Sequence, residues 1–181
     1  IIGGPTVLGY TSAIIGLTSL ISGTLNLGIN IGLQKFIGEA VGQQDRKKLS
    51  TYFWSTIIFS ALLYFIAGSL LLIMALTGFS FGDFSPEAFI ICSFLVALSL
   101  NLNFSSFFIA MLKTSIVALI AVIGNITRLA VGISLVILGW GWIGASLGYV
   151  CDYLITVIAY LALSRRYSGD QVVFSLSAIT V

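Results

Sequence analysis

The sequence has no histidine, only two cysteines and few charged residues, and each scarcity excludes a class of protein. Without histidine, histidine-based acid–base catalysis and most zinc sites are excluded. Cys92 and Cys151 lie far apart in apolar runs, so we interpret them as small buried hydrophobic residues. Charged residues make up 8% of the chain, against about 25% in a soluble domain. Lipid is therefore the expected solvent for most of the exterior.

Motifs of common enzyme classes are missing too. The sequence contains no Walker loop, no G-x-S-x-G element and no clustered metal ligands. We therefore expect no enzymatic activity, no metal site, no cofactor and no nucleic-acid partner.

What the sequence does contain is long apolar runs. Five of them are long enough to cross a bilayer core of about 30 Å as a helix, and they cover residues 8–33, 51–76, 88–112, 114–138 and 142–163. The sequence therefore predicts an all-α fold, a polytopic bundle of transmembrane helices.

The breaks between the runs carry capping and turn residues. Asp45 is placed to cap the second helix. Ser85, Pro86 and Glu87 supply a capping hydroxyl, a proline for the first helical position and an acid for the first turn. Residues 139–142 (GWGW) predict a tight hairpin with tryptophans at the membrane interface.

Basic residues predict the direction of the helices. Five alternating spans place all the loop lysines and arginines on one side, while the other loops hold only Asp83 and Glu87. This side is expected to be the cytoplasm, so the chain starts outside and ends inside a multi-pass plasma-membrane protein. The basic residues concerned are Lys35, Arg46, Lys47, Lys48, Lys113, Arg165 and Arg166.

Polar residues recur at helical spacing inside two of the spans. Lipid offers them no hydrogen-bond partner, so they either join packed helices or line a hydrated cavity for a polar substrate; the sequence leaves both readings open. The first span carries Ser22, Asn26, Asn30 and Gln34, and the third carries Ser99, Asn103 and Ser106, with Asn101 nearby.

Two charges lie deep in the fourth and fifth spans. Arg128 follows Asn125 between Gly124 and Gly132, and Asp152 follows glycines on the same four-residue spacing. Each charge lies about 15 Å from the 139–142 turn, so both are expected at matching depth on antiparallel neighbours. They form either a structural ion pair or a site for an anionic head group or a coupling ion.

Five segments carry a family resemblance: residues 4–10 (GPTVLGY), 27–39 (LGINIGLQKFIGE), 42–48 (GQQDRKK), 123–129 (IGNITRL) and 139–149 (GWGWIGASLGY). They resemble segments of the polysaccharide and lipid-linked oligosaccharide flippases, a family in the superfamily of multidrug, oligosaccharidyl-lipid and polysaccharide exporters. The resemblance implies two lobes of six helices around a central cavity that works by alternating access. The chain, whose two ends look cut, would be helices two to six of the first lobe.

The resemblance also implies a substrate and its site. Members of this family move lipid-linked sugars. Cationic residues of the cavity bind those sugars that are polyanionic, which makes Arg128 a candidate ligand. The cavity residues that we expect are Arg128, Asp152, Asn26, Asn30, Asn103 and Asn125, with membrane lipid and a coupling ion as further partners. A multidrug or organic-cation antiporter of the same superfamily and a scaffold subunit that transports nothing are the alternatives; a membrane-embedded transferase is a more distant one.

Overall fold

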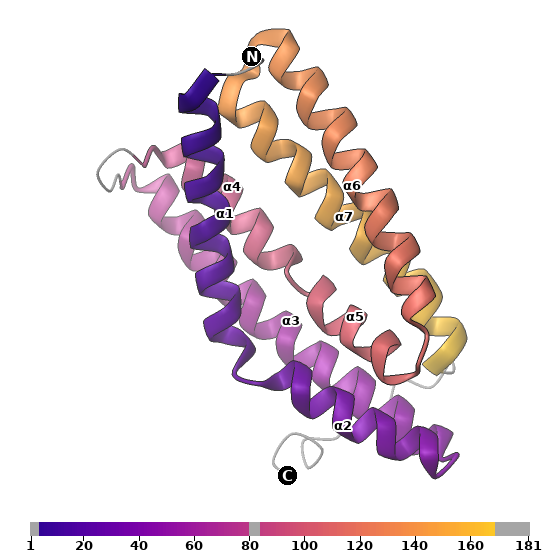
Figure 1. Ribbon diagram of the computed structural model, residues 1–181. Coiled ribbons are helices and arrows are strands. Elements are labelled where there is room, and N and C mark those ends of the chain that lie inside the picture. Colours follow the sequence, from indigo (N-terminus) through magenta and orange to yellow (C-terminus); the bar gives the residue numbers. More distant parts are fainter. Residues whose placement is uncertain (1–3, 80–83, 169–181) are drawn as a thin grey trace.

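The computed structural model describes residues 4–79 and 84–168, and every regular element in this part of the chain is a helix. The predicted all-α helix bundle is therefore confirmed (Figure 1). The elements are α1 (Gly4–Asn26), α2 (Ile29–Gly42), α3 (Arg46–Leu76), α4 (Pro86–Leu98), α5 (Asn101–Ala110), α6 (Thr114–Leu135), the kinked turn η1 (Val136–Trp140) and α7 (Gly141–Ser168).

Four helical stretches in the described residues are long and apolar enough to cross a membrane: Gly4–Asn26, Arg46–Leu76, Pro86–Ala110 and Thr114–Arg165. The last contains 52 residues, and it folds back where Gly139 and Gly141 adopt φ angles of 91° and 51°. Glycine adopts positive φ without steric cost, which is why the hairpin forms at the GWGW segment as predicted. Its arms α6 and α7 lie side by side (Figure 1), and the chain has the architecture of a multi-pass membrane protein.

The first predicted span, 8–33, is wrong as a single helix. The chain leaves the helical conformation at Leu27 and Gly28, whose φ angles are 45° and 80°, so that α1 ends at Asn26 and α2 starts at Ile29. Asn26 stabilises the break, because its Oδ1 accepts a hydrogen bond from the Asn30 amide at 3.1 Å. Consequently the expected stripe from Ser22 to Gln34 does not lie on one continuous helix.

The third predicted span, 88–112, is interrupted as well. Helix α4 ends at Leu98 and α5 begins at Asn101, with Ser99 and Leu100 between them. The Ser99 hydroxyl donates to the Leu95 carbonyl at 2.9 Å, a bond back to the helix that competes with regular backbone pairing. The polar residues at this position therefore mark a break in the helix. Their helical spacing in the sequence did not predict this break.

Both breaks lie at a similar level of the bundle. Helices α2 and α5 pack together, and their C-terminal ends meet in one cleft lined by Ala40, Val41, Met111 and Lys113. At 1.5 Å per residue, α2 is about 21 Å long and α5 about 15 Å long, so their first residues lie at about these distances from the cleft. The breaks therefore lie within about one helical turn of each other.

Two buried clusters form the core, one on each side of this level. The first joins α2, α3, α5 and α7 through Leu33, Ile37, Phe53, Phe104, Phe107, Phe108 and Tyr160, and we call it the basic-end core. Its centre is the pair Phe53 and Phe107, with ring centroids 4.1 Å apart. The second, the far-end core, joins α1, α3 and α4 through Ile14, Tyr64, Leu71, Phe89, Cys92 and Val96.

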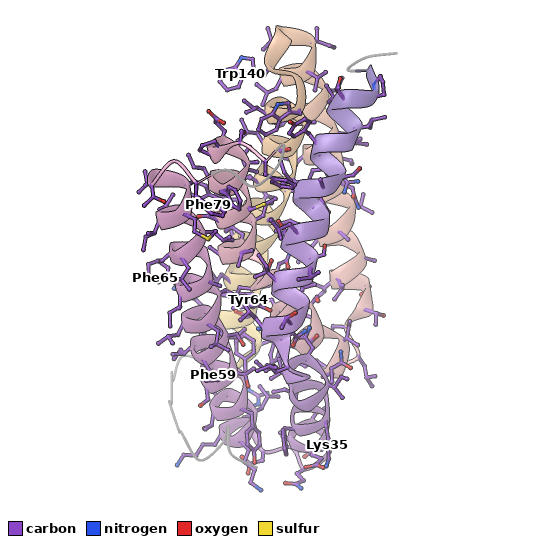
Figure 2. All side chains as sticks on the ribbon, turned by 90° about the vertical axis from the view of Figure 1, so that its left-hand side faces the viewer. Lys35, Phe59, Tyr64, Phe65, Phe79 and Trp140 are labelled. Atoms are coloured by element: carbon purple, nitrogen blue, oxygen red, sulfur yellow. The ribbon has the colours of Figure 1, made fainter. Side chains whose placement is uncertain are left out.

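Side chains on the outside of the bundle are apolar. Figure 2 shows Phe65 of α3 pointing away from the other helices, and 70% of its surface is exposed. The adjacent Tyr64 is 2% exposed within the far-end core. An apolar exterior of this kind is stable only against lipid.

The loop lysines and arginines in the described residues gather at one end of the bundle. One cleft there is lined by Arg46 from the start of α3, Lys113 from the α5–α6 turn and Tyr167 from the end of α7, and the Lys113 ammonium lies 3.7 Å from the Tyr167 ring centroid. Figure 2 shows Lys35 at this end and Trp140 at the opposite one. Asp83 lies outside the described residues.

The predicted caps are confirmed in part. Asp45 caps α3, because its Oδ1 accepts from the amides of Lys47 and Lys48, each at 3.1 Å. Pro86 occupies the start of α4 and Glu87 its first turn, but the Ser85 side chain makes no capping hydrogen bond there.

Candidate functional site

Helices α6 and α7 approach each other closely along their glycines. A Cβ placed on Gly148 of α7 would lie 2.7 Å from the Arg128 carbonyl oxygen and 3.0 Å from the Gly132 Cα of α6. No real side chain fits there, so the contact requires glycine, as the four-residue spacing predicts.

Asp152 lies against a further glycine of this interface, one turn farther from the hairpin. A Cβ on Gly124 would overlap the Asp152 Oδ1 and would lie 2.8 Å from the Thr156 Cγ2. Gly124 thus leaves open the space in which the carboxylate of Asp152 lies.

The carboxylate opens onto a cleft of about 240 Å³ between α5, α6 and α7, which we call the Asp152 cleft. Two asparagines from the other helices line it, Asn101 at the start of α5 and Asn125 of α6. The remaining polar groups come from Ser105, Tyr153, Thr156 and Tyr160. One carboxylate and two amides from three helices therefore share one cleft within the membrane-spanning segments.

Arg128 lies on a different side of the hairpin. Its guanidinium carbon is 4.7 Å from the ring centroid of Tyr149, a cation–π contact. It lines the Arg128 cleft, a space of about 380 Å³ between α1, α6 and α7 whose other walls include Val7, Leu8 and Thr11. Most of these neighbours are apolar, so Arg128 is an isolated cation in an apolar groove.

Arg128 and Asp152 do not form the expected ion pair. The one pair within 4.0 Å among the described residues joins Lys48 and Asp45, at 3.8 Å. The register of the hairpin explains the difference, because it sets Arg128 opposite Gly148 and Asp152 opposite Gly124. The two charges are therefore offset by one helical turn, about 6 Å, rather than at matching depth, and they interact electrostatically without direct contact.

The expected cavity asparagines divide between different places. Asn125 lines the Asp152 cleft. Asn26 accepts the backbone amide of Asn30 at the break between α1 and α2, and the Asn30 Oδ1 is buried without a hydrogen-bond partner among the described residues. Asn103 is 1% exposed, and neither its Oδ1 nor its Nδ2 has a hydrogen-bond partner, so it lies inside the bundle.

Two residues of the site were not predicted as ligands from the sequence. Asn101 was noted only as a neighbour of a polar stripe, and the helix break that brings it to the cleft carries no strong sequence pattern. Tyr149 precedes Asp152 by three residues, and its place one turn away on the same helix face was the available indication that an aromatic ring accompanies the charges.

The site can offer a negative charge with neutral oxygens on one side of the hairpin and a positive charge in an apolar groove on the other. Among the described residues these are the charges placed well inside the predicted spans.

No protein-family model matches the chain, and no match is found among curated proteins or among solved structures.

Proposed function

We propose that the chain is part of a membrane transporter that moves lipid-linked oligosaccharides or polysaccharide precursors across the plasma membrane by alternating access. The observation that carries this proposal is that Arg128 and Asp152 open onto separate clefts instead of neutralising each other. A charge inside a membrane costs at least about 2.5–3.5 kcal/mol when it is not compensated. Charged residues that lie inside a membrane without forming an ion pair, despite this cost, are typical of substrate and ion pathways.

The chemistry of the Arg128 cleft suits an amphipathic anion. The guanidinium binds phosphate oxygens with two donors at once, and the apolar walls formed by Val7, Leu8, Ile133 and Val136 suit a hydrocarbon chain. Asn101 and Asn125 in the neighbouring cleft offer amide groups that can bond sugar hydroxyls. The basic end of the bundle faces the cytoplasm in this proposal.

One observation favours a second candidate, an organic-cation antiporter. Asp152, Tyr153 and Tyr160 line the same cleft, and aromatic faces together with a carboxylate bind organic ammonium groups. The two candidates differ in which cleft contacts the substrate, so the same pair of variants tests both.

The test is a flipping assay with the purified full-length protein in proteoliposomes that contain a fluorescent lipid-linked oligosaccharide. The exposed fraction of the lipid is measured by adding an impermeant quencher. We expect Arg128→Leu to lower the rate at least ten-fold, while Lys47→Gln at the basic end keeps it.

Three other results would speak against the flippase. Unchanged flipping in Arg128→Leu removes the Arg128 cleft from the pathway. Accumulation of an organic cation that requires Asp152 but not Arg128 establishes the antiporter instead. Absence of transport of either substrate by folded protein favours a scaffold.

A further inference from the structure

We infer that the cleft at the basic end of the bundle binds the phosphate headgroup of an anionic phospholipid, with the Arg46 guanidinium and the Lys113 ammonium as its ligands. This cleft, which we call the Lys113 cleft, has a volume of about 430 Å³, within the usual range of about 300–1,000 Å³ for small-molecule sites. It lies where the α2–α3 turn, the α5–α6 turn and the end of α7 meet. The inference goes beyond the proposed function, because this lipid stays bound to the helix ends and is not transported.

The two cations that line the cleft have no acidic partner. In the described part of the chain, the one ion pair within 4.0 Å joins Lys48 to Asp45, so neither Arg46 nor Lys113 forms an ion pair there. The Lys113 ammonium lies 3.7 Å from the centroid of the Tyr167 ring instead, a cation–π contact that positions the charge without neutralising it. Two unneutralised cations in one cleft favour an anionic ligand, and phosphate oxygens accept hydrogen bonds from both guanidinium and ammonium groups.

Asp45, the one acid among the described residues that line the cleft, is already compensated. Its Oδ1 accepts the amides of Lys47 and Lys48, each at 3.1 Å, and its Oδ2 lies 3.8 Å from the Lys48 ammonium. The same ammonium donates to the Gln43 Oε1 at 3.1 Å. The Asp45–Lys48 pair therefore adds no net charge, and the cleft keeps the positive charge of Arg46 and Lys113.

The two turns that border the cleft have the same backbone geometry. In each turn two successive amides donate to carbonyls three and five residues earlier, those of Gln44 and Asp45 after α2 and those of Leu112 and Lys113 after α5. This is the Schellman motif that ends many helices. Lys113 thus takes the same place in its turn as Asp45 in the other, and backbone hydrogen bonds fix both positions at the rim of the cleft.

Apolar residues at the cleft favour a lipid over a soluble phosphate. Leu112, next to Lys113, is 87% exposed and has a φ angle of 58°, a conformation that glycine usually supplies at a helix end. An exposed leucine in this place contacts lipid favourably and water unfavourably. The wall of the cleft includes Ala40, Leu49 and Met111, which suit the glycerol and acyl carbons next to a lipid phosphate. Basic clefts between helix ends at the membrane surface bind anionic headgroups in this way.

The test measures lipid binding in the absence of any transport substrate. Purified full-length protein in detergent is titrated with phosphatidylglycerol or with phosphatidylcholine, and the thermal unfolding midpoint is recorded at each lipid concentration. A ligand that binds only the folded state raises the midpoint. We expect phosphatidylglycerol to raise it by about 2–4 °C when the lipid exceeds its dissociation constant about ten-fold, and phosphatidylcholine to leave it unchanged.

Variants assign the effect to the cleft. Arg46→Gln and Lys113→Gln each remove one cation and should raise the dissociation constant for phosphatidylglycerol about ten-fold. Lys47→Gln makes the same change of charge beside Arg46 but outside the cleft, so it should leave the constant unchanged. Lys113→Arg keeps a cation and should bind the lipid, which separates loss of charge from loss of packing on Tyr167. Arg46 is exposed at the start of α3, so Arg46→Gln serves if Lys113→Gln does not fold.

Inorganic phosphate, added in place of chloride at constant ionic strength, distinguishes the lipid from a soluble anion and should not shift the midpoint. A rise with inorganic phosphate as large as that with phosphatidylglycerol overturns the inference. The absence of a rise with phosphatidylglycerol, an equal rise with phosphatidylcholine, or a rise that persists when Arg46→Gln and Lys113→Gln are combined overturns it as well. Flipping by a protein that does not prefer phosphatidylglycerol contradicts the headgroup site alone, and this preference in a protein that does not flip the lipid-linked oligosaccharide contradicts the proposed function alone.

Discussion

The carboxylate of Asp152 on α7 occupies the space that a side chain on Gly124 of α6 would fill. This relationship fixes the register of the hairpin and turns the acid toward the cleft between α5, α6 and α7. It also separates the acid from Arg128, which lies one turn closer to the hairpin.

The first prediction concerns Gly124 itself. Gly124→Ala should destabilise the folded protein by about 1–3 kcal/mol, the usual cost of overpacking a tight contact. Unfolding of the purified protein in a mixture of detergent and denaturant measures the change.

Gly23→Ala is the matched control, because its new Cβ would meet nothing within 4 Å and the residue lies in α1. Alanine is a better helix former than glycine by about 0.5–1 kcal/mol, so this variant should be as stable as the parent or slightly more so. Equal stability of both variants would contradict the close packing of α6 on Asp152.

A double-mutant cycle separates the partners of Arg128. The contact with Tyr149 predicts a coupling of about 0.5–2 kcal/mol between Arg128→Leu and Tyr149→Leu. The cycle of Arg128→Leu with Asp152→Leu should give a smaller coupling, since no direct ion pair joins these residues. A larger coupling with Asp152 than with Tyr149 would show that the ion pair forms after all.

Phe53 and Phe65 of the same helix test the two kinds of apolar surface. Phe53 is 0% exposed in the basic-end core, whereas Phe65 is 70% exposed on the outside. Phe53→Ala should cost about 3–5 kcal/mol through the cavity that it leaves, and Phe65→Ala should cost far less. The comparison is made by chemical unfolding in detergent, and similar losses for both would place Phe65 in a protein contact.

Orientation is tested by labelling single cysteines in intact cells after Cys92 and Cys151 have been replaced. Gln44→Cys at the basic end should be shielded from an impermeant thiol reagent, and Thr77→Cys at the end of α3 should react, since basic loops stay in the cytoplasm. Both positions are exposed on the protein. The reverse pattern would invert the proposed orientation.

Water access to the Asp152 cleft is a separate question. Asn125→Cys should react with a small polar thiol reagent, because the residue is exposed and lines the cleft. The side chain of Leu62 is 56% exposed as well, but it lies on the outer face of α3, which we expect to contact lipid. A cysteine at this position should stay protonated and react slowly. Mass spectrometry after timed labelling measures both rates, and equal inertness would mean that the cleft is dry.

The sequence was sufficient to predict the helical class, the hairpin at residues 139–142 and the Asp45 cap, because each follows from local chemistry or from the length of an apolar run. It did not predict the breaks at Leu27–Gly28 and at Ser99–Leu100, since neither position carries proline and the apolar runs continue through both. The predicted matching depth of Arg128 and Asp152 is also wrong, because the close glycine contacts set Asp152 opposite Gly124 and Arg128 opposite Gly148. Which side of a helix meets which neighbour depends on tertiary packing that no single run encodes.

The positions of the two helix breaks have a mechanical consequence. The α1–α2 and α4–α5 segments are jointed at a similar level and pack on each other on both sides of it, α1 on α4 and α2 on α5. Helices α3, α6 and α7 pass this level without a joint, and the two cores lie on either side of it. We therefore expect the bundle to bend most easily at the level of the two helix breaks. Such bending would move Asn101, which lies next to a break, relative to Asp152 on the continuous helix α7.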